Sequence, residues 1–543
     1  MTNGVNRRRL LAGIATASAV FPLSVGARQA AAEESISADQ CGAEPDLLSV
    51  VPQDSRYAEL SRGVNQRWVA TPEAVHLVGS ARQAQHVVQA AVDAGKRLSV
   101  RSGGHCYGDF VCNPEIDVIL DVSLMNEVFY DAERRAFCVE AGAQLGQIYE
   151  QLYRGWGVTL PGGACLTVGI GGHASGGGFG MLTRKYGLVA DQIEAVEMVV
   201  VDASGQARTV VASRDPEDPA HDLCWAVSGG GGGSFGVITR FWFRSPQATG
   251  TDPSAQLPAP PPEVLIGLAE VPWSALDDAE FGSLMRNFAD WHIANGSVDS
   301  RFIDLSGYLV LRQGPQGGVS LFTQVDGGNP NADQLLADYT AALIRDTGIP
   351  ATIPTRRVSW LASTKLVGTS NQAMFYDHSL RSGTKSAFLR RGFTDEQLAV
   401  IHRHMVREDY NNPHAAISLN GGGGQHDAVD PAATPYPHRD TAFFALFESF
   451  WTAPGEDATH LGWQREVFRD TFADTGGYPV PNDQTDGCYF NDPDTDIMDP
   501  AYNASGVPWH ALYFKDNYRR LQEVKSRWDP SDVFRHAQSV RPL

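Results

Sequence analysis

The sequence predicts an α+β fold divided into more than one domain. The chain has 543 residues, which is long for a single ordinary core, and 43% of them are hydrophobic, which is enough to fill a packed interior. Strand and helix patterns follow one another between residues 75 and 211. A proline-rich stretch between Ser245 and Pro262 then marks a domain boundary.

The first half of the chain has the clearest local signals. The apolar run Val75–Val78 predicts a strand, and Ser80 is a suitable cap for the helix after it. That helix carries one apolar stripe and ends near Gly95. The same criteria predict strands at 98–100, 118–120 and 136–139, a helix at 145–152, and a hairpin formed by 194–201 and 207–211.

The region beyond the proline-rich stretch mixes helical patterns with short alternating runs. Its clearest element is a helix over 394–404. From Pro479 onward the chain is rich in turn residues and then in aromatic residues. No fixed-period repeat is present, so a repeat architecture is excluded.

Charge and cysteine content exclude several classes of protein. The formal net charge of −20 disfavours nucleic acid and anionic membrane surfaces as partners. The seven cysteines are few and irregularly spaced, and they form no zinc-binding pattern. Their odd number leaves at least one without an intramolecular disulfide partner.

The N-terminus has the features of an export signal. Tandem arginines at 7–9 precede an apolar stretch over 10–25, and Ala30–Ala32 offers a small-residue cleavage site. This pattern predicts a twin-arginine-type signal peptide over 1–32 and a secreted, extracytoplasmic protein with no membrane contact in its mature form. An uncleaved anchor is the alternative, but the stretch contains Gly13 and Pro22 and is short for a membrane span.

Three glycine-rich runs are the strongest functional signals. The first is 101–105, Arg-Ser-Gly-Gly-His, at the end of a predicted strand; the second extends from Pro161 to Gly180; the third covers 229–233. Glycine lets the backbone approach a phosphate or a flat ligand closely. The second run does not open a helix within a compact βαβ unit, so it is not a Rossmann fingerprint. It predicts backbone pressed against a flat ligand.

Together these runs resemble the berberine-bridge-enzyme-like FAD-linked oxidases. The resemblance also includes Cys224-Trp225-Ala226 before the third run and Trp528-Asp529-Pro530 near the C-terminus, and it covers about residues 45–541. Within the family the chain is similar to actinobacterial antibiotic-tailoring oxidases. The resemblance implies an α+β fold with a two-part FAD-binding domain of the PCMH type, 33–245 completed by 479–543. It also implies a substrate-binding domain, 246–478, with a large antiparallel sheet covered by helices.

The resemblance further implies FAD held by two covalent bonds. His105 would bond the C8 methyl group of the flavin and Cys165 would bond C6. A small residue, Val168, beside the oxygen-reactive face favours an oxidase over a dehydrogenase. The remaining residues implied to bind the cofactor are Arg101, Ser102, Gly103, Gly104, Cys106, Tyr107, Pro161, Gly162, Gly169, Gly171, Gly172, His173, Gly176, Gly177, Val237, Tyr513 and Asn517.

The sequence departs from the related oxidases at the proton acceptor. Those oxidases carry an Asn-Tyr-Pro-Asp run near the C-terminus, and this chain has Asp492 at the position of its tyrosine. A second tyrosine, expected within 417–422, is also missing. A carboxylate can take a hydroxyl proton if burial raises its pKa, so Asp492 is the first candidate base and Tyr489 the second. An aspartate before proline is also a common turn residue. Tyr107 could instead line the ring, and His426 either reaches the pocket or lies on the surface.

These observations predict an oxygen-dependent oxidase acting on a small-molecule alcohol or glycoside. It would transfer hydride from an alcohol, a secondary one on a secondary metabolite or its sugar, to flavin N5 and release hydrogen peroxide. The alternatives are a free-sugar or oligosaccharide oxidase, an oxidative cyclase or desaturase on the same scaffold, and a binding protein that has lost catalysis.

Overall fold

The computed structural model describes residues 47–350, 353–369 and 379–543. The chain from Asp46 to Leu543 forms one compact unit, and the predicted divisions near 245 and 479 fall within it. The predicted signal peptide, residues 1–32, lies outside the described residues. Within the described part, no helix is both long and apolar enough to cross a membrane.

A four-stranded sheet leads into the first glycine run. Strands β2 (Ala74–Leu77), β4 (Val118–Asp121) and β3 (Leu98–Arg101) are parallel, and β1 (Leu48–Val50) pairs antiparallel with β2. The run beginning at Arg101 therefore leaves the sheet at its carboxyl edge, where ligands bind in open parallel sheets.

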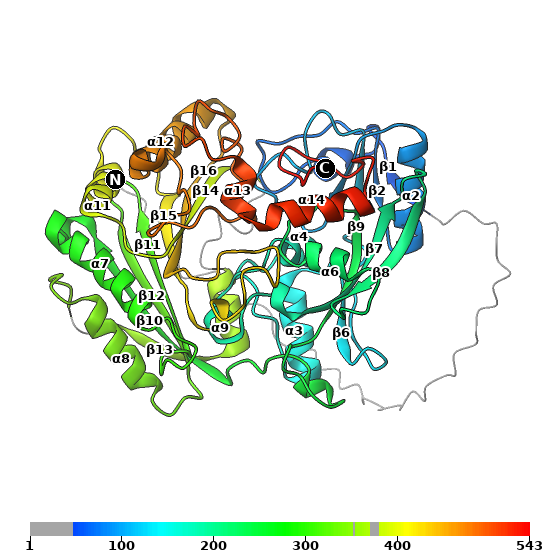
Figure 1. The fold of residues 1–543 in the computed structure, drawn as a ribbon. Coiled ribbons are helices and arrows are strands. Elements are labelled where there is room, and N and C mark those ends of the chain that lie inside the picture. Colours follow the sequence, from blue (N-terminus) through cyan, green and yellow to red (C-terminus); the bar gives the residue numbers. More distant parts are fainter. Residues whose placement is uncertain (1–46, 351–352, 370–378) are drawn as a thin grey trace, which may run out of the picture. The chain divides into compact units, whose positions relative to one another are not determined.

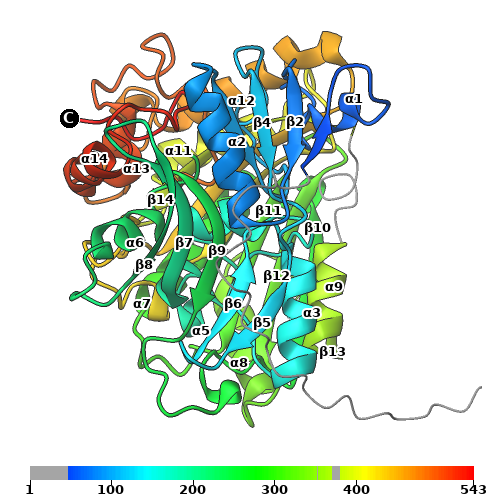
Figure 2. The same ribbon diagram turned by 90° about the vertical axis from the view of Figure 1, so that its right-hand side faces the viewer.

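A five-stranded antiparallel sheet lies next to the first sheet. Its order is β5 (Val128–Asp131), β6 (Ala136–Glu140), β9 (Val237–Phe243), β7 (Ile193–Val201) and β8 (Ala207–Ser213). Helix α2 (Ala81–Asp93) contacts β4 as well as β7, β8 and β9, so its apolar stripe fills a core shared by both sheets. Figure 2 shows α2 between β4 and the strands β7 and β8.

A seven-stranded antiparallel sheet forms the centre of the region 246–478. Four helices lie on one side of it: α7 (Asp278–Ala294), α8 (Ala332–Leu343), α11 (Asp395–Val406) and α12 (Asp457–Thr471) (Figure 1). This arrangement confirms the fold class that the sequence predicts. The strand order is β13 (Thr355–Ser359), β10 (Glu263–Pro272), β12 (Gly318–Asp326), β11 (Leu305–Arg312), β15 (Ala415–Gly421), β16 (Phe443–Trp451) and β14 (Arg381–Leu389).

The two faces of this sheet differ in polarity and exposure. Along β15 the residues alternate between buried and half-buried, as the period of a strand requires. Ile417 and Leu419 are fully buried, whereas Ser418 and Asn420 on the opposite face are only half-buried. Along β15 the apolar, fully buried side chains therefore share one face, and the polar, half-buried side chains share the other.

Shorter helices connect the sheets and return the C-terminus to the first part of the molecule. Helix α14 (Asn517–Trp528) packs on α6 (His221–Val227), and Lys525 Nζ donates to the carbonyl oxygen of Ser234 over 2.7 Å. The C-terminal segment is thus anchored to the third glycine run. The remaining helices are α1 (Tyr57–Leu60), α3 (Leu145–Trp156), α4 (Ile170–Ser175), α5 (Thr183–Tyr186), α9 (Trp360–Gly368) and α13 (Trp509–Phe514).

The helices and strands predicted from the sequence are confirmed, with small shifts at their ends. The Ser80 hydroxyl accepts the N–H of Gln83 and caps α2, and Gly95 follows that helix with φ of +63°. The helix predicted over 394–404 runs from Asp395 to Val406, because Thr394 is its cap rather than its first turn. The hairpin is also confirmed, and its second strand extends to Ser213.

Candidate active site

The first two glycine runs touch each other backbone to backbone. A Cβ atom on Gly103 would lie 2.3 Å from the backbone nitrogen of Gly169 and 2.9 Å from the carbonyl oxygen of Thr167. Real Cβ atoms are not found so close to backbone, so only glycine fits at this position. Gly104 adds a left-handed φ of +74°, which also favours glycine. The close approach fixes the position of residue 105 relative to residues 165–167.

The two predicted attachment residues meet at this junction, although 60 positions separate them in the chain. His105 Nε2 lies 2.9 Å from Thr167 Oγ1, and Cys165 Sγ lies 3.6 Å from the same oxygen. An imidazole and a thiol are thus held side by side by one hydroxyl. Two nucleophiles in this arrangement suit two neighbouring positions on one edge of a flat ring.

The environment of Cys165 differs from that of Cys106, the thiol next to His105 in the chain. Burial raises the pKa of Cys165 above its usual value, and hydrogen bonds from the Thr167 hydroxyl and from the N–H groups of Thr167 and Val168 offset only part of this rise. Burial raises the pKa of Cys106 to about 12, with smaller lowering by two backbone hydrogen bonds. Of these two thiols, Cys165 is the one placed to become a thiolate.

A second group of glycines receives the C-terminal segment. A Cβ atom on Gly176 would lie 1.9 Å from Asn491 Oδ1, and Asn491 Nδ2 donates to the carbonyl oxygen of His173 over 3.0 Å. The ring of His173 accepts the N–H of Gly163 at Nε2 over 3.0 Å, and burial lowers its pKa to about 4. The imidazole is therefore neutral and ties α4 to the run that carries Cys165.

Tyr489 anchors the same segment. Its hydroxyl oxygen accepts the N–H of Gly178 over 3.0 Å, the N–H of Phe179 over 3.3 Å and the amide of Asn491 over 3.1 Å. Burial, and then the charge of Asp492, raise the pKa of Tyr489. These contacts fix the residues around Asp492 against the glycine-rich run, and they leave the Tyr489 oxygen little capacity to take another proton.

Two buried carboxyl groups lie close to Tyr107. Asp492 is 8% exposed and Glu448 is 5% exposed, and neither forms an ion pair with a described lysine, arginine or histidine. Asp492 Oδ2 and Glu448 Oε1 have no hydrogen-bond partner among the described residues. Burial raises the pKa of Tyr107 well above its usual value, and the charges of Glu448, Asp492 and Cys165 raise it further.

The two carboxyl groups titrate as neighbours. Burial raises the pKa of Asp492 to about 7. Burial, and then the charge of Asp492, raise the pKa of Glu448 to about 8, while a hydrogen bond from Ser418 lowers it. A charge on one carboxyl group disfavours ionisation of the other, so the two protons of the pair leave at different pH values. A carboxylate with this pKa is a suitable general base.

Glu448 is a candidate residue that sequence reasoning missed. Strand register places it on β16 directly opposite Thr384 of β14 and Ala416 of β15, on the more polar face of the sheet. Thr384 Oγ1 is also buried without a hydrogen-bond partner among the described residues. The available signal was a single acidic residue inside the apolar strand Phe443–Trp451, since a buried charge needs a reason.

Arg101, predicted to contact the cofactor, is held by the protein itself. Its Nη1 donates to the carbonyl oxygens of Leu60 over 2.7 Å and Arg62 over 3.0 Å. Its Nε lies 3.1 Å from Asp121 Oδ2. The guanidinium therefore braces the strand that leads into the first glycine run.

Three further predicted contacts lie farther along the chain. The Tyr513 oxygen accepts the N–H of Asp494 over 3.1 Å, and Asn517 Nδ2 donates to the carbonyl oxygen of Pro431 over 2.7 Å. The Val237 side chain is fully buried at the start of β9. Contacts of these residues with a cofactor stay predictions.

His426 does not lie on the surface, so that alternative is wrong. It is fully buried, its Nδ1 lies 2.6 Å from Asp427 Oδ1, and its Nε2 lies 3.1 Å from the hydroxyl oxygen of Tyr436. His426 therefore contacts Tyr436, which in turn packs against Tyr489.

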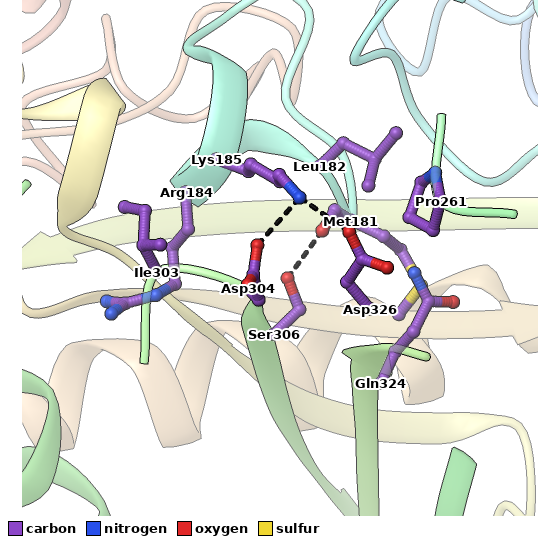
Figure 3. Close-up of a pocket in the computed structure, with 10 residues that line it drawn as sticks. All are labelled: Met181, Leu182, Arg184, Lys185, Pro261, Ile303, Asp304, Ser306, Gln324 and Asp326. Carbon is purple, nitrogen blue, oxygen red and sulfur yellow. Dashed lines mark hydrogen bonds and ion pairs between the residues drawn. The ribbon is translucent and has the colours of Figure 1, made fainter. Parts of the chain in front are cut away.

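A separate small pocket lies between α5 and the seven-stranded sheet. In Figure 3 the amino group of Lys185 reaches two carboxylates, Asp304 at 2.7 Å and Asp326 at 2.5 Å, and Ser306 Oγ donates to the carbonyl oxygen of Met181. Lys185 forms ion pairs with both carboxylates. No residue of the first glycine run lines the pocket. These contacts tie the second glycine-rich region to the sheet.

Comparison with known proteins identifies related sequences and structures. Residues 72–210 match the model of an FAD binding domain, and residues 488–541 match the model described as berberine and berberine like. The chain is 43% identical over 517 residues to aclacinomycin-N/aclacinomycin-A oxidase of Streptomyces galilaeus, covering 95% of this chain and 94% of that protein.

Solved structures with similar folds include a flavoenzyme and a hexose oxidase. CrmK, described as a flavoenzyme of shunt product recycling in caerulomycin biosynthesis, is 46% identical with a TM-score of 0.89, over 92% of this chain and 100% of that chain. A glycopeptide hexose oxidase, DBV29, complexed with teicoplanin, is 42% identical with a TM-score of 0.87 and the same coverage.

Proposed function

The chain belongs to the berberine-bridge-enzyme-like family of FAD-linked oxidases, and we propose that it oxidises an alcohol with FAD held by His105 and Cys165 and with oxygen as acceptor. The observation that carries this proposal is the convergence of the two side chains on Thr167. Forming each bond removes one hydrogen from the cofactor and one from the side chain, and molecular oxygen takes up both as hydrogen peroxide.

The loops between the sheets fit the rest of FAD. The backbone N–H groups of Gly103 and Gly104 donate no hydrogen bond to another described residue, so they are available to phosphate oxygens. Residues 162–168 are all half-buried, which suits a run that lies along a flat ring. Val168, the last residue of this run, is the small residue that leaves room for oxygen. When bound, FAD supplies the two-electron oxidation by taking a hydride from the alcohol carbon.

The residues of the chain supply position and proton transfer. Asp492 accepts the hydroxyl proton at Oδ2, because its carboxylate is buried, unpaired and has a pKa near 7. Glu448 remains protonated beside it and keeps the pair at a single negative charge. Tyr489 and Asn491 hold this segment against the glycines.

The proposed substrate is a secondary alcohol group on a secondary metabolite or on its sugar. Relatives named for aclacinomycin and for a glycopeptide support this class. The half-buried Ser418 and Asn420 on the open face of the sheet can bind hydroxyl groups. A free-sugar oxidase is the second candidate, supported by the 27% identity to the hexose oxidase of Chondrus crispus. Peroxide release from free sugars compared with glycosides separates the two.

Export of the folded protein completes the proposal. The tandem arginines and apolar stretch of residues 1–32 support a twin-arginine route. That route carries folded proteins, so FAD would be attached before the chain leaves the cytoplasm. The enzyme would then act outside the cytoplasm.

The proposal is tested by denaturing the purified protein in acid and asking whether the yellow colour stays with the chain. We expect the peptides containing His105 and Cys165 to be released as one species, joined through a single flavin. His105→Ala and Cys165→Ala should each keep one link, and the double variant should keep none. Cys106→Ala is the matched control, because this thiol adjoins His105 and should stay unmodified. Unmodified masses for both wild-type peptides would refute covalent attachment.

A further inference from the structure

The hydroxyl of Thr167 touches both attachment residues, at 2.9 Å from His105 Nε2 and 3.6 Å from Cys165 Sγ. From this geometry we infer that Thr167 is a positioning residue that sets the protonation of both side chains. When Cys165 loses its proton, the Thr167 hydroxyl donates to the sulfur and accepts from the Nε2–H of His105. The inference rests on the double attachment proposed above.

The direction of this hydrogen-bond chain follows from the donors available. A hydroxyl has one proton to donate and can accept from a second group. The N–H groups of Thr167 and Val168 also donate to the sulfur, so three donors surround it and favour its anionic form. When Cys165 is a thiolate, the single proton of the Thr167 hydroxyl is used on the sulfur, so the hydroxyl oxygen accepts and the ring nitrogen of His105 donates.

The consequence for His105 is a fixed tautomer. With the proton on Nε2, the lone pair lies on Nδ1, and Nδ1 is then the nucleophilic atom of the ring. Thr167 cannot drift from this position, because its own carbonyl oxygen packs against Gly103 two residues before His105. The Thr167 side chain thus contacts both nucleophiles, His105 and Cys165. The backbone contact of Thr167 with Gly103 holds it in this position.

The thiolate of Cys165 depends on these hydrogen bonds. The titratable groups that face it are His105, Tyr107 from the first loop and Tyr149 from α3. Burial raises the pKa of both tyrosines, so both are neutral at neutral pH. The groups that lower the pKa of Cys165 are Thr167 and Val168, and burial opposes them. Removing the hydroxyl therefore removes one of three stabilising contacts.

The test compares Thr167→Val, which has a similar shape without the hydroxyl, with Thr167→Ser, which keeps the hydroxyl. Full-length protein made in a flavin-deprived host is incubated with FAD in air, and the masses of the two peptides are followed with time. At pH 7 we expect Thr167→Val to form the Cys165 link roughly tenfold more slowly, because a hydrogen bond to a charged group shifts a pKa by about one unit. Raising the pH should restore the rate, and Thr167→Ser should resemble the wild type.

A wild-type rate for Thr167→Val at pH 7, or a loss that alkaline pH does not restore, would overturn the inference. Unmodified wild-type peptides would instead refute the proposed function itself, so the two failures are distinguishable. If Thr167→Val does not fold, alkylation of the wild-type chain before FAD is added gives a second test. Cys165 must then react at lower pH than Cys106, and equal titration of the two thiols also overturns the inference.

Discussion

The two walls of the site are built on different principles. The cofactor wall consists of backbone, because the runs at 101–105 and 161–178 press glycine against glycine and place few large side chains between them. The substrate wall consists of side chains on one face of a seven-stranded sheet, where Glu448, Ser418 and Thr384 are brought together by strand register. Backbone geometry constrains the first wall, and long-range pairing constrains the second.

This difference explains why substitutions should act differently on the two walls. A side chain added to the cofactor wall meets backbone that cannot move aside, so the expected damage is structural. A side chain changed on the substrate wall keeps the strands paired, so the expected damage is to proton transfer and to pH dependence. The three predictions below test this contrast.

The largest effect is expected from Gly103→Ala. The new Cβ atom would lie 2.3 Å from the backbone nitrogen of Gly169, which forces the two loops apart. We expect the free energy of unfolding to fall by about 3 kcal/mol and flavin attachment at His105 and Cys165 to be lost. Urea unfolding and the flavin content of the denatured chain measure the two effects.

Gly155→Ala in α3 is the matched control. A Cβ atom there has no neighbour within 4 Å, and alanine is the better helix former, so stability should rise by up to about 1 kcal/mol. Normal flavin attachment in Gly103→Ala would show that the backbone contact does not shape the cofactor wall.

The cofactor wall could be predicted from the sequence because its steric demands leave only one residue type. These glycine runs carry the resemblance to FAD-linked oxidases, and that resemblance gave His105 and Cys165 as predicted attachment residues. The structure places both side chains against the Thr167 hydroxyl. The sequence could not predict the role of Thr167, because no sequence pattern marks a threonine whose hydroxyl contacts both His105 and Cys165. The role of Thr167 becomes visible only in the structure, where the backbone of Gly103 lies against the backbone of Thr167.

The substrate wall could be predicted only in part. Asp492 stands out because it replaces an expected tyrosine in a recognisable run. Glu448 does not, because its importance depends on which strands pair with β16 and on how they are aligned. Local patterns give the length and type of each strand, but the register between distant strands is set by the packing of the whole sheet. The fold class was therefore predictable and the face lining the substrate was not.

A smaller, local effect is expected from Asp492→Asn. Loss of the proton acceptor should lower kcat by about 10²- to 10⁴-fold, while the fold and flavin attachment stay normal. In the wild type, kcat/KM should rise as the pH passes through about 7, because the active form of Asp492 is the carboxylate. That acidic limb should disappear in the variant.

Asp483→Asn, exposed on the same C-terminal segment, is the control and should leave both the rate and the pH profile unchanged. A variant at Asp492 that turns over at the wild-type rate would assign proton removal to another group, with Glu448 as the next candidate.

The smallest effect on turnover at neutral pH is expected from Glu448→Gln, since glutamine resembles the protonated acid already present. The change should instead appear in the pH dependence. The folded chain holds the Glu448 proton up to a pKa of about 8, whereas an unfolded glutamate releases it near its ordinary value of 4.5. The folded state therefore binds more protons between these values, and the contribution of Glu448 to stability falls as the pH rises through that window.

Glutamine has no proton to lose, so Glu448→Gln should unfold with a higher free energy than the wild type above pH 8, by on the order of 1–3 kcal/mol, and with the same free energy near pH 4. The basic limb of kcat/KM near pH 8 should also vanish. Urea unfolding across this pH range measures the first effect, with exposed Glu523→Gln on α14 as the control. Parallel stability curves for Glu448→Gln and the wild type would mean that Glu448 is ionised like any surface acid. The substrate wall would then carry two charges, and Asp492 would have no protonated partner.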